Sequence, residues 1–251
     1  MKIKNPFDRT DVTIKKSDSV IEVGPGPYPT RRADVLVEKF PTSNYHRSDD
    51  ALFYSHQQVI IADGACMPFK DKEFDYIICC QVVEHAEDAA AFIDEHVRVA
   101  KRGYLEAPSL IGELLFPKES HKWAMLEIDD KLVLFEKSKF TSEYKPDFGN
   151  TFLNHLPYNS LAMRLLMYTH GDIFTIRYEW KDGIDYLINP EDPYYKSFFT
   201  KTWTDEMMYK IFPKRSKWQE IKLIARAICF IVKGAVKHRF ARTNTRKIKD
   251  L

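Results

Sequence analysis

Short apolar runs separated by turn residues dominate the first half of the chain. Five of them follow one another, at Val20–Val23, Asp34–Glu38, Val59–Ala62, Phe74–Cys80 and Tyr104–Ala107. Runs that are apolar at successive positions, rather than at alternate ones, are typical of strands covered on both faces of a parallel sheet. The pattern therefore predicts five buried strands, with Gly and Pro residues marking the loops between them.

The connections between these runs decide the fold class. Residues 87–100 have helical spacing that places Phe92, His96 and Val99 near one face, and Gly103 is expected to end this helix. Only 16 positions separate Glu22 from Glu38, so the first crossover is either about one helical turn or an extended loop. The order predicts an α/β fold with a doubly wound sheet, a shortened first crossover and ligands at the carboxyl ends of the strands.

The second half of the chain gives a coarser pattern. We expect a hairpin, a loop, a strand and two helical segments, at residues 123–136, 140–157, 173–180, 194–211 and 218–238 in that order. On the last helix, Lys222, Arg226, Lys233 and Lys237 form a basic stripe, and apolar residues occupy the other faces.

Charge is distributed unevenly along the 251 residues, although the net charge is only +2. Lys214–Leu251 contains 12 Lys and Arg against 2 Asp and Glu, or +10, so the remainder carries −8. This segment could lie on an anionic membrane surface, or its helix could pack on the core and leave a solvated end; both alternatives stay open. Nucleic acid is not favoured, because the body is acidic and shows no known binding module.

Cysteine spacing and the polar N-terminus indicate the compartment. The four cysteines form no CxxC pair, which predicts neither a zinc site nor a disulfide framework. Residues 1–19 contain no apolar segment of a secretory signal, and no stretch reaches the ~20 apolar residues of a membrane span. We expect a cytoplasmic protein, with peripheral contact at the inner membrane face as an open alternative.

Candidate binding residues lie at the ends of three successive strands. Glu22, Gly24 and Gly26 accompany the first, Glu38 ends the second, and Asp63 follows the third. A carboxylate such as Glu38 accepts both hydroxyl protons of a ribose diol, and glycines let the backbone approach a ligand closely. Asp63 is placed to accept from an adenine amino group. These features predict a nucleoside site.

The loop after the first strand discriminates between cofactors. A dinucleotide site presents free backbone N–H groups to the pyrophosphate, whereas Pro25, Pro27 and Pro29 have none. Pro29 also stands where the third glycine of GxGxxG is required. The loop therefore argues against NAD, and it suits S-adenosylmethionine, which carries no phosphate.

The segments VIEVGPGPYP (20–29) and ADGACMPFKDKEFDYIICCQVVEHAED (62–88) resemble the type 11 group of class I S-adenosylmethionine-dependent methyltransferases, except that Tyr28 occupies the usual third glycine position of the loop. The resemblance covers residues 20–109 and implies a Rossmann-like fold. It also implies cofactor residues: Glu22, Gly24 and Gly26 on the methionine and ribose side, Glu38 at the ribose, Asp63, Gly64 and Ala65 at the adenine, and Gln81 at the methyl-facing side. We expect a cofactor domain over residues 1–140, a substrate-side region over 141–213 and a basic extension over 214–251.

The acceptor side is defined by three candidate catalytic residues: His85, Glu106 and His121. Alignment of nucleophile, methyl and sulfur supplies much of the catalysis, and a hydroxyl acceptor also requires a general base. We expect methyl transfer to a small molecule or glycan, at oxygen. A non-catalytic cofactor-binding protein and a nucleotide-dependent oxidoreductase are the alternatives, and no ligand spacing supports a metal site.

Overall fold

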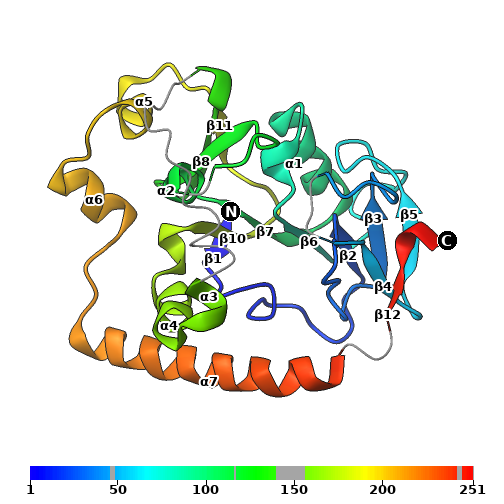
Figure 1. Cartoon of the computed structure of the whole chain (residues 1–251). Helices are drawn as coiled ribbons and strands as arrows, with labels where there is room; N and C mark the ends of the chain where they lie inside the picture. Colours follow the sequence, from blue (N-terminus) through cyan, green and yellow to red (C-terminus); the bar gives the residue numbers. More distant parts are fainter. Residues whose placement is uncertain (46–48, 116, 140–155, 242–244, 251) are drawn as a thin grey trace. The chain divides into compact units, whose positions relative to one another are not determined.

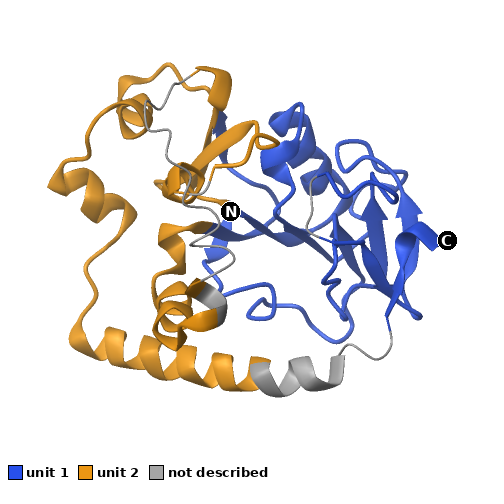
Figure 2. Cartoon of the chain, in the orientation of Figure 1, with its two compact units in different colours: residues 1–107, 176–188, 244–251 blue, residues 108–175, 189–243 orange. Residues whose placement is uncertain are grey.

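A computed structural model describes residues 1–45, 49–115, 117–139, 156–241 and 245–250, and it divides the chain into two compact units. Unit 1 comprises Met1–Ala107, Ile176–Ile188 and Asn244–Leu251, and unit 2 comprises Pro108–Thr175 and Asn189–Thr243 (Figure 2). These units do not follow the three ranges expected from the sequence, because two later segments return to the unit that the N-terminal residues form.

Unit 1 is built on a seven-stranded sheet in the order β1-β10-β7-β6-β2-β3-β5 (Figure 1). Its strands are β1 (Lys2–Lys4), β2 (Val20–Val23), β3 (Val35–Glu38), β5 (Gln58–Ile61), β6 (Tyr76–Cys80), β7 (Arg102–Pro108) and β10 (Thr175–Lys181). The strands from β5 to β7 pair in parallel, and β1 pairs antiparallel with β10. The five strands expected from the apolar runs, and the strand expected near residue 175, are confirmed.

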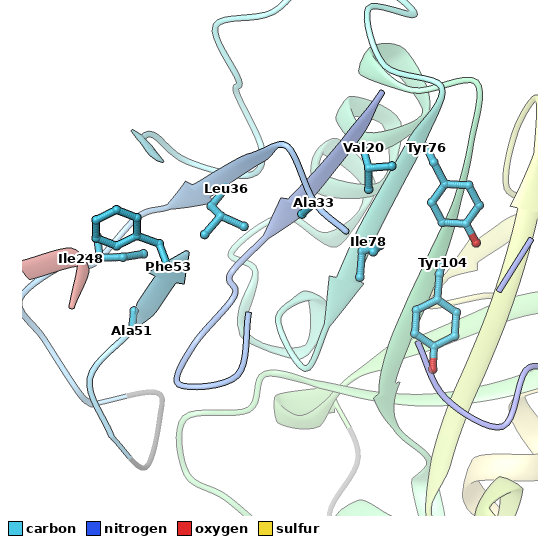
Figure 3. Close-up of a cluster of buried hydrophobic side chains, with 9 residues drawn as sticks. All are labelled: Val20, Ala33, Leu36, Ala51, Phe53, Tyr76, Ile78, Tyr104 and Ile248. Carbon is cyan, nitrogen blue, oxygen red and sulfur yellow. The ribbon is translucent and has the colours of Figure 1, made fainter. Parts of the chain in front are cut away.

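Continuous apolar sequence explains why the middle strands are buried. All four residues of β2 and the first four residues of β6 are buried. A core cluster on one side of this sheet is shown in Figure 3. Its buried members are Val20, Ala33, Leu36, Ala51, Phe53, Tyr76, Ile78, Tyr104 and Ile248. Burial of this apolar surface supplies the main stabilisation of unit 1.

The first crossover contains no helix, as the 16-residue spacing allowed. The backbone N–H of Gly24 donates to Val37 O at 2.8 Å, so the loop turns across the end of β3. The Gly26 carbonyl then accepts from the N–H of Leu52 at 2.9 Å, in β4 (Leu52–Tyr54). The loop is therefore held by backbone hydrogen bonds on both sides.

The helix expected over residues 87–100 is α1 (Ala89–Val99), which follows the 3-10 turn η1 (Val83–His85). Asp88 caps α1 by accepting from the Ala91 N–H, and Phe92, His96 and Val99 are buried along one face. The expected role of Gly103 is wrong. The C-cap is Ala100, and Gly103 lies inside β7, where a Cβ would lie 2.4 Å from Ile77 Cγ2.

Unit 2 contains the expected hairpin, formed by β8 (Trp123–Ile128) and β9 (Lys131–Glu136), which pair antiparallel. Around it the chain forms α2 (Leu110–Leu115), η2 (Lys137–Lys139), α3 (Leu156–Asn159), α4 (Leu161–Thr169) and η4 (Gly171–Ile173). Of the expected loop over 140–157, residues 140–155 lie outside the described part of the chain, and α3 begins at Leu156.

The helical pattern over residues 194–211 is two helices, α5 (Pro193–Thr200) and α6 (Asp205–Ile211). The side chain of Thr204 caps α6 by accepting from the Met207 N–H, so a new helix starts where the sequence pattern suggested a continuous one. The last helix is α7 (Lys217–Ala241), which confirms the helix expected over residues 218–238.

The chain does not end as a solvated basic tail. The strand β12 (Thr245–Lys247) pairs antiparallel with β4, and Ile248 in η5 (Ile248–Asp250) is buried in the core cluster of unit 1. Lys247 and Lys249 each place Nζ 2.9 Å from Asp50 Oδ2, and these hydrogen bonds hold the pKa of Asp50 well below its usual range. The strand β11 (Tyr186–Ile188) completes the elements of unit 1.

No helix in the described ranges combines the length and the apolar content needed to cross a bilayer.

Candidate functional site

The carboxyl ends of β2, β3, β5 and β6 lie along the same edge of the sheet, because these strands are parallel (Figure 1). In register, Val23 lies beside Val37 on one side and Cys79 on the other, and Glu38 lies beside Ile61. The loop glycines, Glu38, Asp63 and Gln81 therefore follow neighbouring strands at one edge. This is where the expected cofactor residues of unit 1 come together.

The glycines after β2 are required by the backbone. Gly24 has φ +63° and Gly26 has φ +56°, in the left-handed region that side chains disfavour. A Cβ on Gly24 would also lie 2.5 Å from Val82 Cγ2, whereas one on Gly26 would meet nothing within 4 Å. The loop thus turns close to the segment after β6 at Gly24 and into open space at Gly26.

Glu22 is buried inside the protein's own hydrogen-bond network. Its Oε1 accepts from Arg9 Nη1 at 3.0 Å, and its Oε2 accepts from the Thr30 N–H at 2.6 Å. Burial raises the pKa of the Glu22 carboxyl, and Arg9 and Thr30 only partly offset that effect. Glu22 therefore fixes the far end of the loop to the sheet, and contact with a cofactor stays a prediction. Arg9 was missed, because nothing in its polar segment points to β2.

Glu38 ends β3 with a buried side chain. Its Oε1 accepts from the Phe40 N–H at 2.8 Å, which holds the carboxylate over its own turn. This bond orients the carboxylate, and a carboxylate can accept several hydrogen bonds, as the two hydroxyls of a ribose require. Contact of Glu38 with a cofactor stays a prediction.

Asp63 lies in a tight turn after β5. Its Oδ1 accepts from the Ala65 N–H at 2.9 Å, and its Oδ2 lies 2.6 Å from Lys39 Nζ. Burial alone would raise the pKa of Asp63, but the hydrogen bonds from Lys39 and Ala65 outweigh it and lower the pKa. Asp63 is therefore an ionised acceptor, as an adenine amino group requires. Lys39 was missed by the sequence analysis, although it directly follows Glu38.

Gly64 allows the turn to pack on its neighbours. A Cβ there would lie 2.7 Å from Phe92 Cε2 and 2.8 Å from Val23 Cγ1. Any larger residue would push the Asp63–Ala65 turn away from the end of β2. The turn at the expected adenine position is thus held against both the sheet and α1.

Gln81 follows β6 with φ +58°, which is rare for a residue with a side chain and is found at functional sites. Its N–H donates to the Glu106 carbonyl at 2.7 Å, and its Nε2 lies 3.3 Å from Glu106 Oε1. Glu106 also accepts from the Tyr104 hydroxyl, and Arg177 Nε lies 3.7 Å from its Oε2. Gln81 and Glu106, expected separately from the sequence, form one polar network in unit 1.

His85 ends η1, four residues after Gln81, and is half-buried. Its backbone N–H donates to Val82 O at 3.0 Å, which closes the short turn after β6. The cofactor residues expected in unit 1, with His85 and Glu106 of the catalytic candidates, therefore lie within or directly after successive strands.

His121 belongs to unit 2, where it is buried beside Glu113. His121 Nδ1 lies 2.6 Å from Glu113 Oε2, and Lys137 Nζ donates to the other carboxylate oxygen. Burial would raise the pKa of Glu113, but the hydrogen bonds from His121 and Lys137 lower it. A carboxylate that accepts from Nδ1 favours the tautomer whose Nε2 accepts a proton, the arrangement of a general base. Glu113 was missed, because its eight-residue separation from His121 carries no motif.

Comparison with known proteins gives a family match over part of unit 1. Residues 39–105 match the model described as "Methyltransferase domain". The matched range contains Asp63, Gly64, Ala65, Gln81 and His85, and it begins after Glu38.

A relative and two solved structures illustrate the similarity. An uncharacterised protein of Methanocaldococcus jannaschii is 50% identical over 68 residues, covering 25% of this chain and 33% of that protein. An S-adenosylmethionine-dependent methyltransferase of Thermotoga maritima is 18% identical with a TM-score of 0.27, covering 38% of this chain and 45% of that one. A protein of Pyrococcus horikoshii is 16% identical with a TM-score of 0.35, covering 65% and 81%.

The similarity to this relative spans about a third of its length. The structural scores are too low to bear on function, so the family match carries the identification. It confirms the resemblance seen in the sequence, to the type 11 group of class I methyltransferases with S-adenosylmethionine as cofactor, over residues 39–105.

Proposed function

We propose that this chain transfers the methyl group of S-adenosylmethionine to a small-molecule or glycan acceptor, at oxygen. The observation that carries the proposal is the set of polar groups at the carboxyl edge of the sheet. Glu38 and Asp63 supply carboxylates at the ends of β3 and β5, and Gly24 brings backbone close to the segment after β6. These are the groups that a nucleoside with a diol and an amino group requires.

The residues of this edge suit the cofactor. Glu38 would hold the ribose hydroxyls and Asp63 the adenine amino group. The bound cofactor supplies an activated methyl group on a sulfonium, so the protein's task is to align the acceptor with it. Pro25, Pro27 and Pro29 leave the loop short of the N–H donors that a pyrophosphate needs, which supports this cofactor over NAD.

An acceptor hydroxyl also loses a proton, and His85, Glu106 and His121 are the proposed proton acceptors. Glu106 is engaged by Tyr104 and Gln81, so it suits positioning more than proton transfer. His121 has the carboxylate partner that a histidine base needs. We therefore favour His121, oriented by Glu113. Loss of a general base lowers kcat by roughly 10²–10⁴-fold.

The cofactor proposal is tested by calorimetry and thermal shift with S-adenosylhomocysteine, NAD and buffer alone. A ligand at 100 times its Kd stabilises the native state by about 2.7 kcal/mol, so only S-adenosylhomocysteine should raise the Tm. Saturable binding of NAD at millimolar concentration would contradict the choice of cofactor.

Catalysis is tested separately, by methyl incorporation from labelled S-adenosylmethionine into a panel of hydroxylated small molecules and glycans. His121→Ala and Glu113→Gln should lower kcat and leave the affinity for S-adenosylhomocysteine unchanged. Cofactor binding without transfer to any acceptor would favour a non-catalytic binding protein instead. Transfer by His121→Ala at the wild-type rate would remove His121 as the base.

A further inference from the structure

The helix α7 has three distinct faces. One face packs against α4 within unit 2 (Figure 1). Ala227 is fully buried there, and the ring of Phe230 lies 5.8 Å from that of Tyr168 in α4. Leu223 and Ile231, which share this side of the helix, are half-buried. The helix is thereby anchored to α4 along one side, and its other two faces are set by that contact.

The second face is apolar and exposed to solvent. Trp218, Ile221, Ile224, Ile228 and Val232 are 73%, 55%, 39%, 50% and 58% exposed. Their spacing of three, three, four and four residues places them in one stripe along the helix. Single exposed apolar residues are ordinary on a protein surface, but a contiguous stripe marks a surface that binds something apolar.

The third face is basic and borders this stripe. Lys222, Arg226 and Lys233 are exposed, and the spacing of the helix places them beside Trp218 and Cys229. From Ile221 to Lys233 the sequence contains no Asp or Glu. Long basic side chains can lay their stems along apolar surface while the charged ends reach an anionic layer.

The start of the helix is well defined, so these faces are held in place. Ser216 Oγ accepts from the Gln219 N–H at 3.3 Å, and Gln219 Oε1 accepts from the Ser216 N–H at 2.7 Å, which is a capping box. Arg215 Nη1 donates to the Thr169 carbonyl at 2.8 Å, at the end of α4. The helix therefore presents its apolar and basic faces in a fixed orientation within unit 2.

We propose that α7 docks the protein on an anionic lipid bilayer, with the apolar stripe in the headgroup boundary and the basic stripe toward the lipid phosphates. An amphipathic helix of this kind lies in the membrane interface and does not span it. Charge favours lipid over a second copy of the chain, because a symmetric dimer through this face would bring two basic stripes together. The proposal is independent of methyl transfer.

Vesicle co-sedimentation of the full chain tests the proposal. Vesicles of phosphatidylcholine and phosphatidylglycerol in equal amounts should bind the protein at low salt, and vesicles of phosphatidylcholine alone should bind it far more weakly. Raising the salt from 0.1 M toward 1 M shortens the Debye length from about 10 Å to about 3 Å, so binding should fall.

Variants on exposed positions locate the contact. Each basic residue near the surface contributes about fivefold to affinity, so Lys222→Glu with Lys233→Glu should weaken binding at least about 25-fold. Ile228→Ser should weaken it several-fold by removing exposed apolar surface. Lys201→Glu and Met208→Ser are the matched controls, because both residues are exposed in unit 2 and lie outside α7 and α4. Circular dichroism and Tm confirm that every variant is folded.

Two kinds of result would overturn the proposal. The first is no sedimentation of the wild-type chain with anionic vesicles at low salt, or equal binding by the α7 variants and their controls. The second is a wild-type dimer that Ile228→Ser converts to a monomer, without vesicle binding by either form, since the face would then hold a second copy.

Discussion

At the residue scale, the side chains at the carboxyl edge are pre-oriented by bonds within their own turns. Glu38 accepts from Phe40, Asp63 accepts from Ala65 and Lys39, and Gln81 is linked to Glu106. Orientation before binding reduces the entropy that a ligand must overcome, so each of these groups contributes more than an unrestrained side chain would.

Glu38 carries the first prediction. Glu38→Ala should weaken the binding of S-adenosylhomocysteine by roughly 1.5–3 kcal/mol, the range for hydrogen bonds to a charged group. Isothermal calorimetry on the folded variant measures the change, and Glu73→Ala, at an exposed residue distant in sequence, is the control. Unchanged affinity in Glu38→Ala would remove this residue from the ribose site.

His96 carries a prediction about pH. Its ring is buried in α1, and Nδ1 lies 2.7 Å from the Phe92 carbonyl oxygen. Because a carbonyl oxygen only accepts, the Nδ1–H is the donor. Burial lowers the pKa of His96 from 6.5 to about 4, although Phe92 and Glu95 oppose the shift. Between these values the unfolded chain binds a proton that the folded chain does not.

Acid should therefore destabilise the fold through His96. Its contribution to the free energy of unfolding falls as the pH drops from 6.5 to about 4, by about 3 kcal/mol in total, and changes no further below that. Urea unfolding at pH 7 and pH 4.5 compares the wild type with His96→Leu, and the difference between the two pH values should be smaller in the variant. An equal acid loss in both proteins would mean that His96 is not the group responsible.

At the element scale, the loop after β2 contains two glycines that differ in why glycine is required. Gly24 and Gly26 share a positive φ, but only Gly24 lies against a neighbour, Val82. The same loop reaches β4 through the Gly26 carbonyl, so its conformation is coupled to the elements on either side. A continuous helix in this crossover would need backbone N–H groups that the prolines of the loop lack.

This difference gives a prediction with its own control. Gly26→Ala should lower the free energy of unfolding by about 1–2 kcal/mol, from backbone strain alone. Gly24→Ala should lower it by more, because its Cβ also meets Val82 Cγ2. Val82→Ala removes the atom that this Cβ would meet. Adding Gly24→Ala to Val82→Ala should therefore lower the free energy of unfolding by less than Gly24→Ala does in the wild type. Equal losses in the two glycine variants by urea unfolding would contradict the close approach.

At the scale of the whole molecule, the chain passes from unit 1 to unit 2 and back twice. Residues 176–188 bring β10 into the sheet order of unit 1, and β12 pairs with β4 at the far end of the sequence. The stability of unit 1 therefore depends on residues that the sequence analysis had placed in a basic tail.

Ile248 tests this dependence. Its side chain is 2% exposed in the core cluster, so Ile248→Ala should lower the free energy of unfolding by about 2–5 kcal/mol. Ile221→Ala, at an exposed position, should change it by less than about 0.5 kcal/mol. A loss as small as that of the control would show that residues 245–250 are not part of the folded unit in solution.

The sequence by itself determined the parallel strands, the α1 helix and the hairpin, because apolar spacing and turn residues are local properties that survive in almost any tertiary context. It also determined which residues lie at the ends of those strands. Because parallel strands bring their carboxyl ends to one edge, the sequence placed Glu38, Asp63 and Gln81 at that edge. The prolines that disfavour NAD were likewise visible in the sequence.

Only the tertiary structure decided which distant residues meet. Arg9 with Glu22, Glu113 with His121, and Ile248 in the core depend on how the chain returns on itself, and no local pattern encodes that return. The same holds for α7, whose apolar residues look alike in sequence. Packing against α4 buries Ala227 and leaves Ile228 exposed, because contact with a neighbour, and not hydrophobicity alone, decides which side of a helix faces solvent.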